Sequence, residues 1–193
     1  MSAYIPVSPT ANRIIKYGDA EVSVIERSWK AAERLPYRKT YSLKPGQKWK
    51  DAAVTPAQWE HYVLLDDGEA IPVGAAITRE LIVEGASSAV FTELWGGVVL
   101  VGPDLVCVQE EGSIRDLLDA LRSATGGSLG GLPDVIAVFP DGRVVMREAK
   151  NVAAKDRLGP KQHAFASVAQ KLLGDRLDLA VVEWGRLQPK TMV

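Results

Sequence analysis

The pattern of apolar and polar positions between residues 131 and 150 predicts a β-hairpin. The runs VIAVF and RVVMREA are rich in β-branched and apolar residues, and the turn sequence PDG separates them. In that turn, proline presets φ and glycine accepts a positive φ. Because side chains alternate along a strand, Glu148 and Lys150 fall on the same face as Val144 and Met146. Two opposite charges therefore share a largely apolar face.

Two further elements are predicted after the hairpin. The run PKQHAFASVAQKLL, at 160–173, follows Gly159 and is ended by Gly174, as expected of a helix. The run LDLAVVEW at 177–184 predicts a buried strand. Since a helical crossover separates it from the hairpin, we expect it to pair in parallel with the hairpin. We expect the tail at 186–193 to be frayed.

The chain before the hairpin contains several regular patterns. Ile114, Leu117, Leu118 and Leu121 form one apolar stripe of an expected helix at 111–124. Acidic residues at the start and Pro36 at the end indicate an amphipathic helix at 19–35. Thr55-Pro56 resembles the start of a second helix, at 55–65. The other expected elements are a helix or strand at 73–84, and two or three strands at 88–109.

Composition places the chain among ordinary globular proteins. Its 193 residues are 47% apolar and 24% charged, enough for one sizeable core. The apolar runs are too short for a membrane span and the N-terminus lacks a secretory pattern, so we expect a cytoplasmic protein. Cys107 is the single cysteine, which excludes a disulfide within the chain, and His61 and His163 lack zinc-site spacing.

Charge is sorted along the chain although the net charge is only −1. Residues 27–50 carry a local balance of +7 and residues 143–161 carry +4, whereas residues 51–125 carry −10. The two basic segments could form a phosphate-binding footprint. The first also contains Trp29, Tyr37, Tyr41 and Trp49, which suit base stacking, although packing of these aromatics on the core or on a second subunit explains them equally well.

Candidate chemistry lies in the hairpin. Asp134, at the start of the first strand, could meet Glu148 across the strand pair, which would bring two carboxylates and the Lys150 ammonium together. Burying charge is costly unless the charge is paired or binds a metal. Carboxylates are the ligands that Mg²⁺ prefers, and a lysine can stabilise charge on a phosphoryl oxygen. The structural alternatives are a turn aspartate and a cross-strand charge pair. A second Pro-Asp pair, at Asp104, has no Glu-x-Lys strand after it.

These residues resemble a known superfamily. Pro133-Asp134 followed by Glu148-Ala149-Lys150 is similar to the signature of PD-(D/E)XK, or restriction-endonuclease-like, nucleases. The sequences GLPD, REAK and DRLGPKQ, in that order, resemble the VRR-NUC branch over about residues 126–185. The resemblance implies an α/β fold with an αβββαβ core, in which a mixed central sheet is flanked by helices, plus an N-terminal accessory segment. We therefore expect residues 1–70 to form that segment and residues 71–193 the nuclease core.

The resemblance also implies a function. Asp134, Glu148 and the Ala149 carbonyl would bind Mg²⁺ or Mn²⁺, Lys150 would act on the attacking water, and Gln162 would lie near the site. The reaction would be DNA phosphodiester hydrolysis that leaves 3′-hydroxyl and 5′-phosphate ends. The basic residues expected to contact DNA are Lys155, Arg157, Lys161, Arg38 and Lys39. A homodimer would let two sites cut both strands.

The sequence departs from this pattern at two positions. The branch usually has a glutamate on its first core helix, and here Glu80, Glu84 and Glu111 are all candidates. Gly159 replaces the usual serine, which removes a hydroxyl N-cap. Two alternatives stay open: a nuclease specific for junctions or flaps, and a non-catalytic nucleic-acid-binding or assembly protein. No organic cofactor is expected, because the glycine-rich SATGGSLGG follows a helix rather than a strand.

Overall fold

The computed structural model describes residues 13–32, 35–39, 42–60, 62–65, 67–92 and 98–185, without the side chains of residues 57–60. Tyr41, His61 and the tail at 186–193, on which predictions were made above, lie outside these ranges. Within the described ranges, the helices are too short or too polar to cross a membrane.

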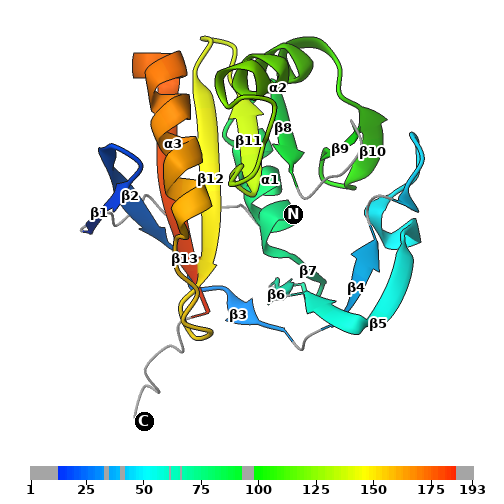
Figure 1. Cartoon of the computed structure of the whole chain (residues 1–193). Helices are drawn as coiled ribbons and strands as arrows, with labels where there is room; N and C mark the ends of the chain where they lie inside the picture. Colours follow the sequence, from blue (N-terminus) through cyan, green and yellow to red (C-terminus); the bar gives the residue numbers. More distant parts are fainter. Residues whose placement is uncertain are drawn as a thin grey trace, which may run out of the picture.

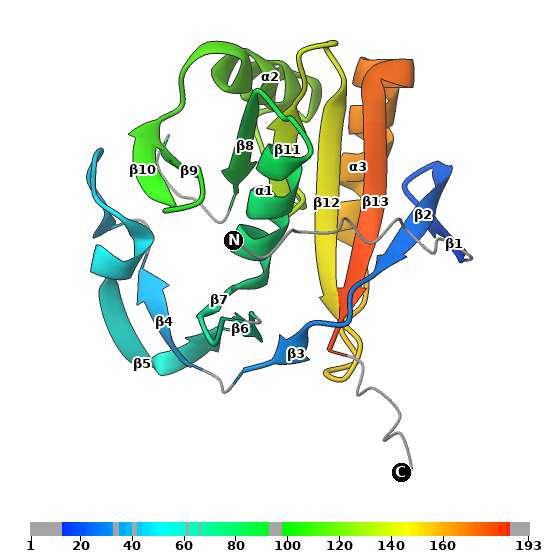
Figure 2. The same cartoon turned by 180° about the vertical axis from the view of Figure 1, so that it is seen from behind.

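The architecture is mixed α/β and is built on one large mixed sheet (Figures 1 and 2). Its strand order is β1-β2-β13-β12-β11-β8-β9-β10. The strands β2, β13 and β12 run parallel to one another, and the remaining neighbours are antiparallel. Their bounds are β1 Ile14–Tyr17, β2 Ala20–Glu26, β8 Ser88–Phe91, β9 Val98–Val101, β10 Val106–Gln109, β11 Val135–Val138, β12 Val144–Asn151 and β13 Leu177–Trp184.

Helices cover both faces of this sheet. Helix α1 (Val73–Val83) packs on one face, while α2 (Gly112–Ala124) and α3 (Pro160–Leu173) pack on the other, as Figures 1 and 2 show from opposite sides. The buried apolar residues accordingly form two clusters, one on each side of the sheet. Strand β12 supplies Val145 and Ala149 to the α1 side and Val144 and Met146 to the α3 side, as strand alternation requires.

Short strands extend the molecule beyond the large sheet. One small sheet contains β3 (Lys30–Ala31), β6 (Tyr62–Leu64) and β7 (Ala70–Pro72), and another contains β4 (Leu35–Lys39) and β5 (Ala53–Glu60). Short 3₁₀ turns span Trp49–Asp51 and Gly174–Arg176. Backbone hydrogen bonds join the segment before the first of these turns to the outer edge of β10, including Cys107 N to Gln47 O at 2.7 Å.

Most predictions for residues 73–184 are confirmed. The hairpin forms β11 and β12, and β13 pairs with β12 in parallel after the crossover through α3. The expected helix at 111–124 is α2, and the expected strands at 88–109 are β8, β9 and β10. The ambiguous segment at 73–84 is a helix.

The two helices predicted near the N-terminus are wrong. Residues 20–26 form β2, in which Val22 and Val24 are buried and their neighbours Glu21 and Ser23 are exposed, so the period is two rather than 3.6. Residues 53–60 form β5, which pairs only with β4 among the described strands. Proline is tolerated on such an edge strand, so Thr55-Pro56 does not start a helix there.

Strands β1 and β2 come from the segment expected to be accessory, yet they belong to the large sheet. Val24 of β2 pairs with Val181 of β13. This pairing brings residues 14–26 beside the elements that carry the candidate site.

Candidate active site

The candidate site lies where β11 begins and β12 ends. Val135 pairs with Arg147, so Asp134 falls just outside the ladder, opposite the end of β12. The Ala149 backbone N–H donates to Asp134 Oδ2 at 2.8 Å. Because the N–H and C=O of one strand residue point to the same side, the Ala149 carbonyl faces the side of β12 on which Asp134 lies.

Glu148 and Lys150 project from β12 on the face covered by α3. Lys150 Nζ and Glu148 Oε1 form an ion pair of 2.8 Å, and the two side chains are only 9% and 3% exposed. Gln162, in the first turn of α3, donates through Nε2 to the same Glu148 oxygen. The side-chain oxygen Oε1 of Gln162 accepts a hydrogen bond from Gly159 N at 2.8 Å. Gln162 therefore links the start of α3 to Glu148 and also caps the helix at the position where Gly159 supplies no side chain.

A close backbone contact holds the Asp134 loop against α3. Gly131 has a φ of +92°, and a Cβ added to it would lie 2.3 Å from the Lys161 carbonyl oxygen. Only glycine fits such an approach. Gly131, Leu132 and the first residues of α3 line an open depression beside the site.

Burial and like charge raise the pKa values of the two carboxyl groups. For Glu148 the pKa is raised to about 8, first by burial and then by Asp134, against the opposing effect of Lys150. Burial also raises the pKa of Asp134, although the Ala149 N–H and Lys150 oppose the increase. Burial alone would lower the pKa of Lys150, but the charges of Glu148, Asp156 and Asp134 outweigh it and the pKa is raised. Two carboxylates thus compete for one ammonium.

The donor set fits a hard divalent cation. Asp134, Glu148 and the Ala149 carbonyl supply oxygen ligands, as Mg²⁺ and Mn²⁺ prefer. Glu148 Oε2 is buried and has no hydrogen-bond partner within the described residues. A buried carboxylate oxygen left in this way is strongly disfavoured unless a ligand satisfies it. In the same part of the chain, no three His, Cys, Asp or Glu side chains form a metal-binding group, so such an ion would also need water or substrate oxygens.

Two residues at the site were not selected from the sequence. Asp156 Oδ1 lies 3.3 Å from Lys150 Nζ, and its position in DRLGPKQ could have pointed to it. Tyr17, at the end of β1, is fully buried and belongs to the same apolar cluster as Met146. Sequence reasoning offers no signal for Tyr17, because only the pairing of β1 and β2 onto β13 brings it there.

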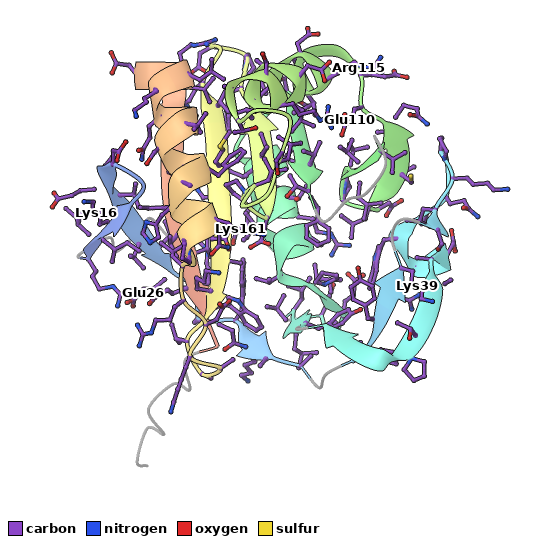
Figure 3. All side chains as sticks on the ribbon, in the orientation of Figure 1. Lys16, Glu26, Lys39, Glu110, Arg115 and Lys161 are labelled. Carbon is purple, nitrogen blue, oxygen red and sulfur yellow. The ribbon has the colours of Figure 1, made fainter. Side chains whose placement is uncertain are left out.

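The predicted DNA contacts fall into two groups. Lys155, Arg157 and Lys161 are exposed in the segment that leads from β12 into α3. Arg38 and Lys39 lie on β4. In Figure 3, Lys39 lies at the right of the molecule, whereas Lys161 lies near the centre, at α3. The Arg38 guanidinium already donates to the Lys50 carbonyl at 2.6 Å and stacks on Trp49, 4.8 Å from the ring centroid.

The three candidate glutamates lie elsewhere. Glu80 on α1 forms an ion pair of 3.0 Å with Arg27. Glu84 is exposed at the C-terminus of α1, and Glu111 is exposed at the N-terminus of α2. Helix α1 covers the opposite face of the sheet from Glu148, which separates Glu80 and Glu84 from the site. Among the described residues, no hydrogen bond or ion pair joins Glu111 to Asp134 or Glu148.

Comparison of the chain with protein-family models, with curated proteins and with solved structures finds no match.

Proposed function

We propose that this protein is a metal-dependent nuclease of the PD-(D/E)XK type, similar to the VRR-NUC branch, which hydrolyses DNA phosphodiester bonds. The observation that carries the proposal is the convergence of Asp134, Glu148 and Lys150, with Glu148 Oε2 buried and unpartnered among the described residues. A packing role would not require two buried carboxyl groups whose pKa values are both raised by burial. At this position the two carboxyl groups could bind a cation and the Lys150 ammonium could contact a phosphate.

The order of elements supports the proposal. Helix α1, strand β8, strands β11 and β12, helix α3 and strand β13 follow one another as αβββαβ. Their strands are neighbours in the sheet in the same order. The elements β9, β10 and α2 are an insertion between the first and second strands of this core.

The side chains have separable roles in this reaction. Asp134, Glu148 and the Ala149 carbonyl would hold Mg²⁺ or Mn²⁺, whose charge neutralises phosphoryl oxygens and lowers the pKa of water. Lys150 stabilises the negative charge that develops on the phosphate. Gln162 fixes the orientation of Glu148 through its amide, and Asp156 limits the movement of Lys150. Rigid placement of this kind favours in-line attack.

The reaction balances as a hydrolysis. The oxygen of a water molecule bonds to phosphorus while the bond from phosphorus to the 3′ oxygen breaks. One water proton is transferred, through solvent or Glu148, to the released 3′ oxygen, and the other leaves with the 5′-phosphate group. Lys155, Arg157 and Lys161 would contact the DNA backbone beside the scissile bond.

The test is cleavage of supercoiled, linear, single-stranded, flap and four-way-junction DNA in Mg²⁺, Mn²⁺ or EDTA. The variants are Asp134→Asn and Lys150→Met, which preserve side-chain volume. The matched control is Asp104→Asn in the second Pro-Asp pair, where the exposed carboxylate forms an ion pair of 3.0 Å with Lys48. We expect metal-dependent cleavage that both site variants reduce by about 10²–10⁴-fold and the control preserves.

Each other outcome has a defined meaning. A strong preference for flap or junction DNA would identify the structure-specific class. If the folded wild-type protein cuts none of these substrates and all variants bind DNA equally, the nuclease proposal fails in favour of a binding or assembly role.

A further inference from the structure

The side chain of Tyr17 is anchored beneath α3 by a tight turn. Gly18 has a φ of +69°, and a Cβ there would lie 2.7 Å from the Ser167 backbone nitrogen, so the β1-β2 turn contacts the helix backbone directly. Gln170 Nε2 donates to the Tyr17 carbonyl at 2.9 Å, and Asp19 N donates to Gln170 Oε1 at 3.1 Å. These contacts fix the position of the Tyr17 backbone relative to α3, and so the point from which its side chain extends.

The ring itself packs beside the candidate site. Tyr17 meets the His163 ring edge to face, with centroids 5.9 Å apart and an interplanar angle of 84°. His163 follows Gln162, and its Nδ1 accepts a hydrogen bond from Gly18 N at 3.2 Å. The phenol therefore packs from β1 against the first turn of α3, next to the residue that hydrogen-bonds Glu148.

Among the described residues, no atom accepts a hydrogen bond from the Tyr17 hydroxyl. In the described part of the chain, three buried side-chain atoms lack a hydrogen-bond partner, namely Tyr17 Oη, Glu148 Oε2 and Ser88 Oγ. Burial, and then the negative charges of Glu148 and Asp134, raise the pKa of Tyr17. The phenol thus keeps its proton and lies within electrostatic reach of both carboxylates. Two of the three unsatisfied atoms, a donor and an acceptor, are buried on the α3 face of the sheet.

One water molecule can satisfy both atoms. Buried polar atoms without partners are rare, and ordered water usually satisfies them. We propose that Tyr17 Oη and Glu148 Oε2 together hold a water molecule, which accepts from the phenol and donates to the carboxylate. This arrangement leaves a lone pair of the water oxygen free to face phosphorus. If the proposed nuclease function holds, this is the attacking water and Tyr17 is its positioning residue.

The first test needs no metal and no substrate. A high-resolution structure of the metal-free protein is expected to contain a water within hydrogen-bond distance of Tyr17 Oη and Glu148 Oε2, which Tyr17→Phe removes or displaces. Because a satisfied hydroxyl is lost, the Tm of Tyr17→Phe should fall by about 2–4 °C. In a Glu148→Met background the same substitution should not lower the Tm, because the water has lost its second partner.

The second test measures cleavage. Tyr17→Phe should lower kcat by about 10–100-fold while KM for DNA stays unchanged, because only the orientation of water is lost. Tyr62→Phe is the matched control, since Tyr62 is also buried but lies on β6 beside Trp49, outside the site. It should leave kcat and KM as in the wild type.

The outcomes separate this inference from the proposed function. Absence of the water, or a higher Tm for Tyr17→Phe, overturns the water site. An active wild type whose kcat is unchanged by Tyr17→Phe overturns the positioning role alone. A wild type that cuts no DNA but holds the water, and loses stability with Tyr17→Phe, supports the water site and rejects the nuclease function.

Discussion

Strand β12 carries charged residues on both faces of the large sheet, and the two charged groups differ in how completely their atoms are paired. By strand alternation, Arg147 faces α1, where it donates to Asp178 Oδ1 and Oδ2 at 2.9 Å each and to the Asp178 carbonyl at 2.7 Å. On the α3 face, Glu148 Oε1 receives both Lys150 and Gln162, while Oε2 receives nothing from the described residues. Both carboxylate oxygens of Asp178 are thus hydrogen-bonded, whereas among the described residues only one oxygen of Glu148 is.

The pKa values of the two carboxyl groups move in opposite directions. Burial acts to raise the pKa of Asp178, but Arg147 and Arg143 outweigh it and the pKa is lowered. For Glu148, burial and Asp134 outweigh Lys150, and the pKa is raised to about 8. A charged residue on an apolar sheet face is therefore not in itself a sign of function. What indicates function is a buried charged group whose atoms are not all paired by its neighbours.

The largest expected difference between the two faces is in catalysis. Glu148→Gln should reduce metal-dependent DNA cleavage by about 10³-fold, because it removes a ligand charge at the reacting centre. Asp178→Asn should leave kcat/KM within about threefold, a change no larger than a weak binding contact would cause. Steady-state cleavage rates at matched folded concentrations measure both. Equal losses in the two variants would remove the distinction between the faces.

A difference in stability is expected between the two ends of the β11-β12 hairpin. Gly131→Ala forces a Cβ to within 2.3 Å of the Lys161 carbonyl oxygen and should lower the free energy of unfolding by about 3 kcal/mol. Gly142 has a similar positive φ of +83° but no atom within 4 Å of an added Cβ, so Gly142→Ala should cost only about 1 kcal/mol. Urea denaturation of both variants checks this, and equal costs would contradict tight packing at the site end.

Stability near neutral pH should depend on Glu148. Its folded pKa of about 8 exceeds the unfolded value of about 4.3, so the folded state retains a proton that the unfolded state has lost. The stability of the metal-free protein should therefore fall as pH rises from about 5 to 8, by roughly 3–4 kcal/mol. Glu148→Gln should flatten this dependence in EDTA. A wild-type profile that is already flat would show that Glu148 ionises freely.

The smallest expected effect is on the acid side and comes from Asp178. Because its folded pKa is lowered, the Arg147-Asp178 pair stabilises the protein above the unfolded pKa of about 3.9 and loses this contribution as pH falls through the folded value. Asp178 is 40% exposed, so solvent screening limits the contribution to under about 1 kcal/mol. Asp178→Asn should reduce the stability lost between about pH 4 and pH 2, measured by thermal unfolding. The same loss in both proteins would assign the acid sensitivity to other groups.

Local patterns predicted the elements around the candidate site. The hairpin, the helix at 160–173 and the parallel strand at 177–184 each have a clear period and turn residues at their ends, and all three formed as expected. The sharing of one face by Glu148 and Lys150 follows from alternation along β12. Their distance from Asp134 depended on strand register, which the turn length of the hairpin restricts.

The N-terminal part could not be predicted in the same way. Acidic residues at the start and Pro36 at the end indicated a helix at 19–35, but the alternation of Val22 and Val24 with polar neighbours was the stronger signal. Tertiary pairing with β13 then decided in favour of a strand. The position of Tyr17 could not be predicted from the sequence, because no local pattern relates a residue of β1 to Glu148.

The pairing of β2 with β13 has a consequence for synthesis on the ribosome. Gly18 and His163 are 145 residues apart, so the β1-β2 hairpin acquires its partners only after α3 and β13 have been made. Contacts of such high sequence separation form late and slowly. Tyr17 therefore packs against α3 only after β13 has been made, whereas Asp134, Glu148 and Lys150 are already present when the β11-β12 hairpin forms. The α3 face of the sheet is thus covered by the β1-β2 turn only after β13 has been made.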